Sequence, residues 1–309
     1  MPKMKNVLAF FRDPHARLTI LSSRGFLKWM SDEQFLKRMY RIRLGKSPDL
    51  EAPRTFNEKM QWLKLHDRCP LYTQMVDKYA VRGYIGEQIG TEYLIPLVGG
   101  PWESFDEIDF DALPEQFVLK CTHDSGGLVI CRDKAGLDVE AARRKIERSL
   151  RRNYYVSSRE WPYKDVKPRI IAEKYMEAAQ SSCLPVYKIL NFDGEPRLIQ
   201  TIQNDKTPQE SIDYFTPVWE LLEMRQYYPN SAVPLERPEC LETMLTLAKR
   251  LNLGLPFIRT DFYEIDGCVY FSEFTFYSDA GFAPFTPREW DERLGSWITL
   301  PASADGGKG

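Results

Sequence analysis

Histidine is scarce in this sequence, and the cysteines form no closely spaced pair. Only three histidines occur among 309 residues, which argues against a metal centre built from imidazole ligands. The six cysteines include no C-x-x-C spacing, so we interpret them as reduced thiols of a cytoplasmic protein and not as disulfides or a zinc site. No Ser-His-Asp or Cys-His arrangement predicts a protein nucleophile.

Long hydrophobic runs and a strong net charge are also missing. No apolar stretch reaches the length of a transmembrane helix, and Val7–Phe11 is too short for the core of a signal peptide. The same short run lies beside Lys5 and Arg12, which permits weak peripheral association with a membrane. The net charge of −2 argues against a dedicated nucleic-acid-binding protein.

The remaining composition is that of an ordinary globular protein, with 43% hydrophobic and 28% charged residues. A chain of 309 residues is long enough for two or three compact units. The first hundred residues have mainly helical patterns, and strand patterns prevail from Phe117 onward. We therefore expect an α+β fold with a helical region over 1–100, a small lid over 101–168, a larger antiparallel-sheet unit over 169–300 and a disordered tail over 301–309.

Local signals place several elements. Ser31 is expected to cap a helix that ends at Leu44 before Gly45, and Thr55 opens a second helix with Glu58 in a capping box. Asp77–Arg82 is expected within a third helix. Further elements are strands at 117–121, 128–131 and 169–175, a helix over 138–152, a hairpin of 186–192 with 197–203 turning at Asp193-Gly194, and a helix over 238–252.

The stretch 257–276 carries the strongest chemical signal. It reads as two β-rich runs joined by Asp266-Gly267, with Arg259, Asp261 and Glu273 inside the strands. Charge within an aromatic sheet is costly unless it is compensated. Two carboxylates brought together favour a hard cation such as Mg²⁺, and an arginine beside them favours a phosphate or a carboxylate.

The loop decides whether Asp261 and Glu273 share a face. A two-residue turn would pair Ile265 with Cys268 and place the two carboxylates on opposite faces. A three-residue loop with Gly267 in the left-handed conformation would place Glu273 opposite Arg259 and diagonal to Asp261, on one face. We predict the three-residue loop. The alternative to a metal site is a cross-strand ion pair between Arg259 and Glu273.

Three further signals precede this hairpin. Lys120 ends a strand and is followed by Ser125-Gly126-Gly127, which suits a nucleotide polyphosphate, although a polar β-turn is the simpler interpretation. The strand that runs into Glu173 can present an adenine-binding edge, or it can be only a buried strand. Lys188 lies in an apolar strand and points either to solvent or to the anion that Lys120 binds.

Two charged segments have uncertain roles. The basic helix at 143–152 is either a solvated face or a contact for an acidic glycan or an anionic membrane surface. It and Arg82 are candidates for binding an acidic acceptor. Asp109-Phe110-Asp111 has the D-x-D spacing that glycosyltransferases use to hold a metal, but it lies in an acidic segment that is typical of surface charge.

In this order the motifs resemble those of the ATP-grasp superfamily, in particular the branch of teichuronopeptide-biosynthesis proteins that is associated with cell-surface polysaccharides. The resemblance runs from about residue 53 to residue 300. It is carried by the stretches TFNEKMQWLKL, DKYAVRGYI, LPEQFVLKCTHDSGG, PRIIAEKYM, YKILNFDGEPRLIQ and FIRTDFYEIDGCVYFSEFTF.

The resemblance implies an ATP-grasp fold, in which two α+β subdomains enclose ATP behind a helical N-terminal region. It implies that Lys120 and Lys188 bind the phosphates and that Arg259, with Lys188, supports catalysis at the acyl phosphate. Asp261 and Glu273 would bind Mg²⁺, with Thr275 at the position where the superfamily commonly has an Asn ligand. The flap over the triphosphate would consist of His123, Ser125, Gly126 and Gly127, and the adenine-binding hinge of Glu173, Lys174, Tyr175 and Met176.

The implied activity is ATP-dependent ligation of a carboxylate to an amine through an acyl phosphate. The expected partners are ATP, the uronic acid carboxylate of a capsular or other surface polysaccharide or its precursor, and an amino acid or other amine. Two alternatives remain open, a glycosyltransferase of surface polysaccharide biosynthesis and a catalytically inactive ATP-grasp scaffold. Thr275, and Val186 in place of the aspartate usual in this branch, leave room for the inactive scaffold.

Overall fold

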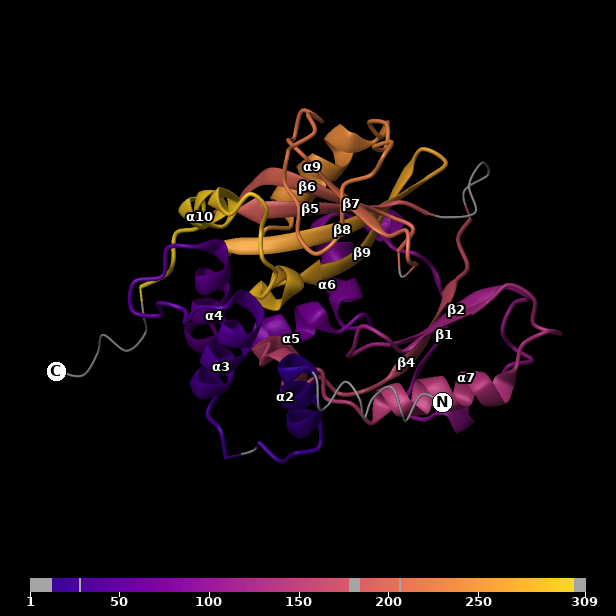
Figure 1. Cartoon of the computed structure of the whole chain (residues 1–309). Helices are drawn as coiled ribbons and strands as arrows, with labels where there is room; N and C mark the ends of the chain where they lie inside the picture. Colours follow the sequence, from indigo (N-terminus) through magenta and orange to yellow (C-terminus); the bar gives the residue numbers. More distant parts are fainter. Residues whose placement is uncertain (1–12, 28, 178–183, 206, 303–309) are drawn as a thin grey trace.

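The computed structural model describes residues 13–27, 29–177, 184–205 and 207–302 (Figure 1). Within these ranges, mainly helical N-terminal residues are followed by two antiparallel sheets, which confirms the predicted α+β fold class. The predictions for Val7–Phe11 and for nearly all of the tail at 301–309 lie outside the described residues. None of the helices in the described ranges has the length and apolar character needed to span a membrane.

The N-terminal helices begin and end largely where the local signals predict. Ser31 and Gln34 form a capping box at the start of α3, and Gly45 ends this helix with a φ of 73°. Thr55 and Glu58 form the second capping box, at the start of α4. The helices of this region are α2 (Pro14–Ser23), α3 (Asp32–Leu44), α4 (Phe56–His66), α5 (Pro70–Val76) and α6 (Val81–Gln88).

A four-stranded antiparallel sheet, in the order β1-β4-β2-β3, forms the smaller unit, which is called the lid after the prediction from the sequence. Its strands are β1 (Leu97–Trp102), β4 (Ile170–Lys174), β2 (Phe117–Cys121) and β3 (Leu128–Cys131). The helix α7 (Val139–Leu150) covers one face, where Phe117 and Leu119 pack into the lid core with Ile146. The sequence analysis assigned residues 169–175 to the larger sheet, but β4 pairs with β1 and β2 in the smaller one.

A five-stranded antiparallel sheet, in the order β7-β6-β5-β8-β9, forms the central unit. Its strands are β5 (Val186–Phe192), β6 (Glu195–Gln203), β7 (Ser211–Phe215), β8 (Phe257–Ile265) and β9 (Cys268–Thr275). The predicted Asp193-Gly194 turn joins β5 to β6, with positive φ at both residues. The strands β1 and β7 were not predicted from the sequence.

Helices cover the central sheet on both faces (Figure 1). α9 (Leu241–Arg250) packs on one face through Leu241 and Met244. The N-terminal helices and the lid lie toward the other face, and one hydrophobic core joins α4, α5 and α6 to the sheet. The remaining helical elements are η1 (Thr91–Tyr93), η2 (Phe105–Glu107), α8 (Tyr155–Ser158), η3 (Trp161–Tyr163), η4 (Ser278–Gly281) and α10 (Glu289–Ser296).

The predicted three-residue loop between β8 and β9 is wrong. Ile265 pairs directly with Cys268 across a two-residue turn of Asp266 and Gly267. Both turn residues have positive φ, 49° and 76°, as a type I′ hairpin turn requires. A regular ladder starting from this turn would place Asp261 and Glu273 on opposite faces of the sheet.

A β-bulge in β9 returns Asp261 and Glu273 to the same face of the sheet. Phe262 pairs with Phe271, whereas Asp261, the residue before Phe262 in β8, pairs with Glu273. Ser272 is thus the extra residue of β9, and from this point the side-chain alternation of β9 is shifted by one. Asp261 and Glu273 therefore lie directly opposite each other on one face. The shared face predicted from the sequence is correct, but a bulge and not the loop produces it.

Candidate active site

One row of side chains crosses the central sheet on the face turned toward the lid. Lys188 of β5 lies directly opposite Asp261 of β8, which lies directly opposite Glu273 of β9. Residues that are directly opposite in adjacent strands project to the same face. Arg259, two residues before Asp261, projects to this face as well and has Thr275 as its partner in β9. The sheet register thus brings together the five residues predicted on these strands.

Arg259 and Asp261 form a buried pair with two hydrogen bonds. Arg259 Nε donates to Asp261 Oδ1 at 2.7 Å, and Arg259 NH2 donates to Asp261 Oδ2 at 2.8 Å. Lys188 Nζ lies 3.7 Å from Asp261 Oδ2. Burial, with the adjacent guanidinium of Arg259, lowers the pKa of Lys188. Lys188 therefore points into the protein at the carboxylates, and the alternative in which it points to solvent does not hold.

Glu273 is surrounded by cations from three parts of the chain. Burial alone would raise the pKa of its carboxyl, but Lys78, Arg259, Lys188 and Lys120 together lower it, so the carboxylate is ionised. Lys78 Nζ is 3.5 Å from Glu273 Oε2 and also donates to the backbone oxygen of Asp124 at 2.8 Å. The cross-strand ion pair of Arg259 with Glu273, which was the alternative to a metal site, is not formed, because Arg259 binds Asp261.

The sequence analysis did not single out Lys78 as a site residue. It placed Asp77–Arg82 in a helix, whereas α6 starts at Val81 and residues 77–80 form the turn before it. Asp77 Oδ1 accepts hydrogen bonds from the backbone nitrogens of Tyr79 and Ala80 at 2.9 and 3.2 Å, which fixes this turn. Lys78 is thereby presented between the glycine loop and β9, a position that only the tertiary fold defines.

Lys120 lies on the lid face that is turned toward the central sheet. Its Nζ donates to Glu173 Oε2, and Arg82 NH1 lies 3.3 Å from Glu173 Oε1. Burial lowers the pKa of Lys120, but the Glu173 carboxylate more than offsets this, so the pKa is raised. The structure therefore joins the predicted phosphate ligand Lys120 to the predicted adenine contact Glu173, and it places Arg82 at the same carboxylate.

The predicted flap is a tight loop between β2 and β3. Asp124 Oδ1 accepts hydrogen bonds from the backbone nitrogens of Gly126 and Gly127 at 3.3 and 3.0 Å. Ser125 and Gly126 are exposed at its tip. His123 is buried, with Nε2 at 3.1 Å from the backbone oxygen of Ser149 in α7. The loop tip can approach a ligand, while the His123 ring packs toward α7.

The two glycines of this loop differ in their surroundings. A Cβ at Gly127 would lie 2.4 Å from Ser149 Oγ and 2.5 Å from Cys121 Sγ, whereas the nearest atom to a Cβ at Gly126 would be 3.9 Å away. We expect Gly127→Ala to destabilise the protein by about 1–3 kcal/mol through overpacking. Gly126→Ala, the matched control, is expected to change stability by less than about 0.5 kcal/mol. Urea unfolding of both variants measures this, and equal stabilities would contradict the loop geometry.

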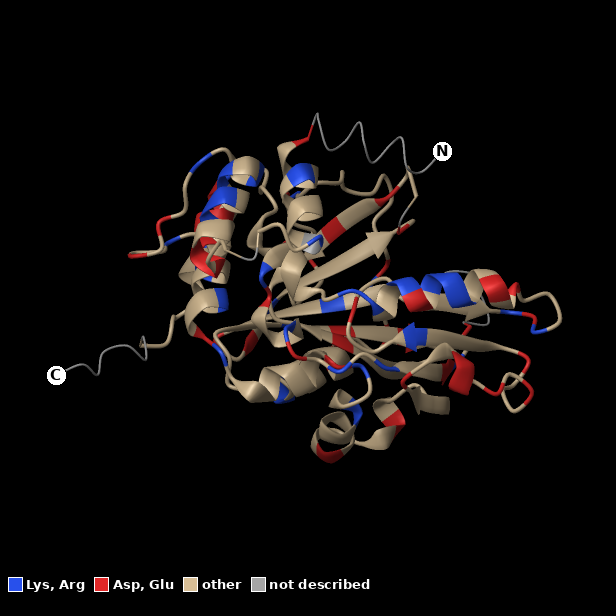
Figure 2. Cartoon of the chain, turned by 90° about the horizontal axis from the view of Figure 1, so that it is seen from below, with Lys and Arg blue, Asp and Glu red and all other residues tan. Residues whose placement is uncertain are grey.

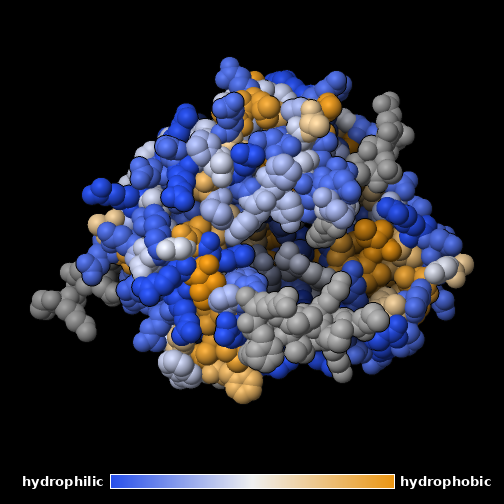
Figure 3. All heavy atoms as spheres, in the orientation of Figure 1, coloured by the Kyte–Doolittle hydropathy of each residue, from blue (hydrophilic) through white to orange (hydrophobic). Residues whose placement is uncertain are grey.

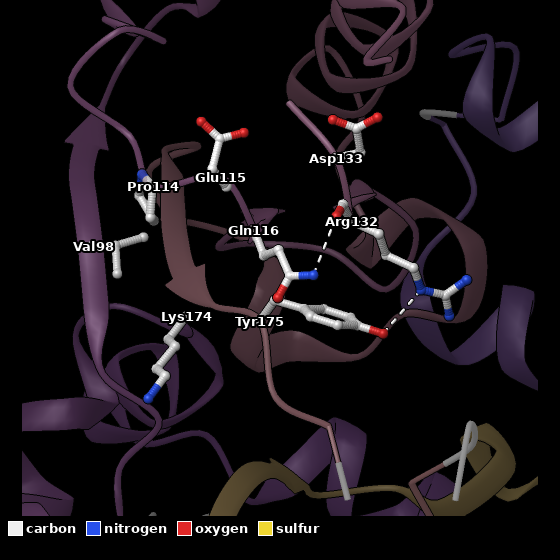
Figure 4. A pocket seen from close by; sticks show the side chains of 8 residues that line it. All are labelled: Val98, Pro114, Glu115, Gln116, Arg132, Asp133, Lys174 and Tyr175. Atoms are coloured by element: carbon white, nitrogen blue, oxygen red, sulfur yellow. Dashed lines mark hydrogen bonds between the residues drawn. The ribbon is translucent and has the colours of Figure 1, made fainter. Parts of the chain in front are cut away.

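Of the other predicted hinge residues, Lys174 faces away from Lys120. Because side chains alternate along β4, Lys174 projects to the face opposite Glu173. Lys174 and Tyr175 line an open cavity of about 630 Å³ at the end of the lid sheet (Figure 4). There Arg132 Nε donates to Tyr175 Oη at 2.8 Å. Met176 follows as a half-buried residue. Only Glu173 of the four hinge residues joins the cluster of charged side chains through its side chain.

A second segment that was not predicted as part of the site is 154–163, which lies between α7 and β4 in the chain. Glu160 is buried there, and burial raises the pKa of its carboxyl, although Lys64 opposes this shift. The rings of Tyr154 and Tyr163 pack against each other with centroids 4.8 Å apart. Burial raises the pKa of Tyr163, and the Glu160 and Glu273 carboxylates raise it further.

The carboxylate pair fits a magnesium ion that is shared with phosphates. Among the residues that the structure describes, no group of three or more His, Cys, Asp or Glu side chains is arranged to hold a metal. Mg²⁺ in nucleotide sites is commonly bound by one or two carboxylates, with phosphate oxygens and water as the other ligands. Asp261 and Glu273 supply two such ligands on one face, and Thr275 lies one pair further along β9.

The other charged segments lie on the surface of the lid. Asp109 Oδ1 accepts a hydrogen bond from the backbone nitrogen of Asp111 at 3.0 Å, so the D-x-D segment is an exposed turn. On α7, acidic residues alternate with the basic ones (Figure 2), and Arg143 forms ion pairs with Asp106 and Glu147. Neither segment contributes a side chain to the row on the central sheet.

The space-filling view shows a hollow between the part that carries the central sheet and the part that carries the lid (Figure 3). Val118 and Ile130 are directly opposite each other on the lid face that also carries Lys120. Ile130 is 49% exposed, so apolar surface is available beside the cations. The arrangement can hold a polyanion between the two sheets and a flat apolar ring against the lid.

A comparison with protein families matches residues 58–299 to the model described as TupA-like ATPgrasp. Among solved structures, a D-alanine–D-alanine ligase from Bacillus anthracis complexed with ATP has 14% identity and a TM-score of 0.39, over 71% of this chain and 55% of that chain. The D-cycloserine synthetase DcsG has 15% identity and a TM-score of 0.39, over 67% of this chain and 64% of that chain. No curated protein matches the sequence.

Proposed function

Because the chain belongs to the TupA-like ATP-grasp family, we propose that it is an ATP-dependent carboxylate–amine ligase. The observation that carries the proposal is the meeting of cations from separate segments at one carboxylate pair. Lys78, Lys120, Lys188 and Arg259 all act on the Glu273 carboxylate. Such a cluster suits a triphosphate with a bridging divalent ion, since phosphate oxygens can replace Glu173 and Glu273 as partners of Lys120 and Lys78, while Arg259 stays paired with Asp261.

The chemistry we propose needs no protein nucleophile. An oxygen of the substrate carboxylate attacks the γ-phosphorus of ATP, the bond from this phosphorus to the bridging oxygen breaks, and ADP leaves. The product is an acyl phosphate. The amine nitrogen then forms a bond to the acyl carbon, the C–O bond to phosphate breaks, inorganic phosphate leaves, and the nitrogen releases one proton.

The residues of the row have separate roles in this proposal. Lys120 from the lid and Lys188 from the central sheet bind the phosphates, and Arg259 stabilises the negative charge that develops at the transferring phosphoryl group. Asp261 holds Arg259 in place through both carboxylate oxygens. Mg²⁺, bound by Asp261 and Glu273, would neutralise phosphate charge during the transfer. Ser125 and the glycines at 126–127 form the flap over the phosphates.

The adenine is proposed to lie between the sheets at the hinge, with Ile130 and Val118 beneath the ring. Glu173, together with backbone groups from Lys174, Tyr175 and Met176, would bind the adenine edge. This requires Lys120 to exchange its contact with Glu173 for one with a phosphate. The lid is the part expected to move, because the flap has to admit and release the nucleotide.

We propose a uronic acid carboxylate of a surface polysaccharide or its precursor as the acidic substrate, and an amino acid or other amine as the second. The support is the resemblance to teichuronopeptide-biosynthesis proteins. A cytoplasmic setting is proposed as well, supported by five described cysteines that are free thiols.

The test measures ADP and phosphate release from MgATP with a panel of uronates and amines. Release that requires both a uronate and an amine is expected, and hydroxylamine should trap the acyl phosphate as a hydroxamate. No ADP release and no hydroxamate with any combination would contradict the proposal. A thermal shift with MgATP that is lost in Lys120→Ala and Asp261→Ala distinguishes an ATP-binding site from an inactive scaffold.

A further inference from the structure

The row on the central sheet continues beyond its charged residues. Gln200 of β6 lies directly opposite Lys188, and Tyr214 of β7 lies directly opposite Gln200, so both project to the face that carries the charged cluster. Both side chains are buried. Neither residue was identified from the sequence, because their place in the row depends on the pairing of three strands.

Hydrogen bonds fix the orientation of the Gln200 amide. The hydroxyl of Tyr214 donates to Gln226 Oε1 at 2.6 Å, so it accepts from Gln200 Nε2, at 3.2 Å. Gln200 Oε1 then has no hydrogen-bond partner among the described residues, although it is fully buried. An unpaired buried carbonyl oxygen next to Lys188 is a position where a ligand donor is expected.

A second free acceptor lies on the turn that follows β9. Asp279 and Ala280 both have left-handed φ, 48° and 53°, although neither is a glycine. Conformations of this kind are strained and persist where the surrounding structure enforces them. The side chain of Asp279 is exposed and has no hydrogen bond or ion pair within the described part of the chain.

Side chains of the helix α4 bind the backbone of this turn. Lys64 Nζ donates to the backbone oxygen of Ala280 at 2.7 Å, and Gln61 Nε2 donates to that of Gly281 at 2.7 Å. A Cβ at Gly281 would lie 2.4 Å from Met60 Cβ, so the turn is pressed onto the helix. Two buried polar side chains thus fix the backbone directly after the exposed carboxylate of Asp279.

The segment after β7 joins Tyr214 to the turn that carries Asp279. Gln226 accepts from the Tyr214 hydroxyl, and the next residue, Tyr227, donates to the backbone oxygen of Phe282 at 2.7 Å. Burial and then the Asp279 carboxylate raise the pKa of Tyr214, and Asp279 also acts on Lys188 and Arg259. The turn that carries Asp279 therefore lies beside the segment that leaves β7, where Tyr227 contacts Phe282 and Arg225 pairs with Thr286. This region offers hydrogen-bond acceptors and negative charge, which repel a carboxylate substrate and attract an amine.

We propose that Gln200 Oε1 and Asp279 form the binding site of the amine cosubstrate, which they hold by its N–H groups beside Lys188 and Arg259. The proposal rests on the ligase function and assigns the side of the cleft from which the amine approaches the acyl phosphate. The acidic substrate would then bind on the opposite side of the cations, where Lys78 and Lys120 lie.

Two variants and a matched control test this site. Asp279→Asn removes the charge and keeps a residue type that tolerates left-handed φ. Gln200→Met removes the free acceptor with little change in volume. Asp266→Asn makes the same change as the first variant in another left-handed position, φ 49°, at the tip of the β8–β9 hairpin. Rates are measured with glucuronate, MgATP and varied ammonium chloride, glycine or ethanolamine.

We expect Asp279→Asn and Gln200→Met each to raise the KM for the amine about tenfold or more, as loss of a hydrogen bond to a charged group does. The KM for ATP should stay within about twofold in both, since a general structural defect would change the two constants together. If Asp279→Asn and Gln200→Met had the same KM for the amine as the control Asp266→Asn, the proposed amine site would be wrong.

A binding measurement separates this inference from the proposed reaction. Binding of the same three amines to the protein with MgADP is followed by ligand-detected NMR. Binding to the wild type that is lost in Asp279→Asn supports the site even if no ligase activity is found. No binding of any amine to the wild type, or equal binding to both proteins, overturns it, whereas a lack of ADP release and hydroxamate contradicts the ligase function alone.

Discussion

Replacing Glu273 by Gln is expected to reduce the rate of ATP-dependent phosphoryl transfer by about 10³-fold. The amide is nearly isosteric with the carboxylate but is a poor magnesium ligand and leaves the surrounding cations without one counter-charge. A metal contributes several kcal/mol to phosphoryl transfer, and each factor of ten corresponds to about 1.4 kcal/mol. The measurement is ADP formation with a fixed uronate and amine at saturating MgATP.

The control for this variant is Glu264→Gln. Glu264 belongs to the same hairpin but projects to the opposite face, since it is three residues from Asp261 in β8. Its replacement is expected to leave the rate within about twofold, in line with the small effects of changes away from special features. If Glu273→Gln were as active as Glu264→Gln, the assignment of the metal-binding face would be wrong.

Replacing Asp261 by Asn is expected to cost about 3–5 kcal/mol of unfolding free energy as well as activity. Arg259 is buried, and its guanidinium donates two hydrogen bonds to the Asp261 carboxylate. Without that carboxylate, the guanidinium is a buried charge that lacks its bidentate partner. Burial lowers the pKa of Arg259, and Asp261, the largest influence that raises it, is then missing. Urea unfolding with and without MgATP measures the loss.

A double variant separates the charge effect from a packing effect. In Arg259→Met with Asp261→Leu both charges are removed together, so no uncompensated charge remains. This variant is expected to be more stable than Asp261→Asn alone, although equally inactive. A destabilisation of Asp261→Asn below about 1 kcal/mol, typical of an exposed ion pair, would contradict the buried geometry.

Local signals were sufficient to predict many of the elements. The two capping boxes at Ser31 and Thr55, the strands of the lid that flank the glycine loop and the Asp193-Gly194 turn each depend on a few neighbouring residues. Such interactions are encoded within one turn of helix or one hairpin. The strands β1 and β7 lack comparable signals, because proline interrupts β1 and β7 is a short buried edge strand.

The bulge at Ser272 illustrates what local patterns cannot supply. The Asp-Gly turn correctly predicted a hairpin, but the register that unites Asp261 with Glu273 depends on one extra residue in β9. Both a longer loop and a bulge satisfy the requirement that the carboxylates share a face. Only the pairing of the whole strands distinguishes the two. The longer loop was predicted because it puts the carboxylates on one face, and the structure has the bulge instead.

The remaining site residues come from contacts that are distant in sequence. Lys78 forms an ion pair with Glu273, which is far from it in sequence, and Gln200 joins the row only because β6 pairs with β5. Nothing in the residues around Lys78 or Gln200 marks them as functional. Their positions follow from sheet order and from the packing of the N-terminal helices on the central sheet, which are tertiary properties.

The central claim is that cations of the lid and of the central sheet bind the same polyphosphate with the carboxylates of β8 and β9. A crystal structure with MgADP tests this most directly. Lys120 is predicted to leave Glu173 and, with Lys188, to contact the diphosphate, while Glu273 binds Mg²⁺. A nucleotide bound elsewhere, for example beside Arg132 and Tyr175, with Lys120 still paired to Glu173, would contradict the account.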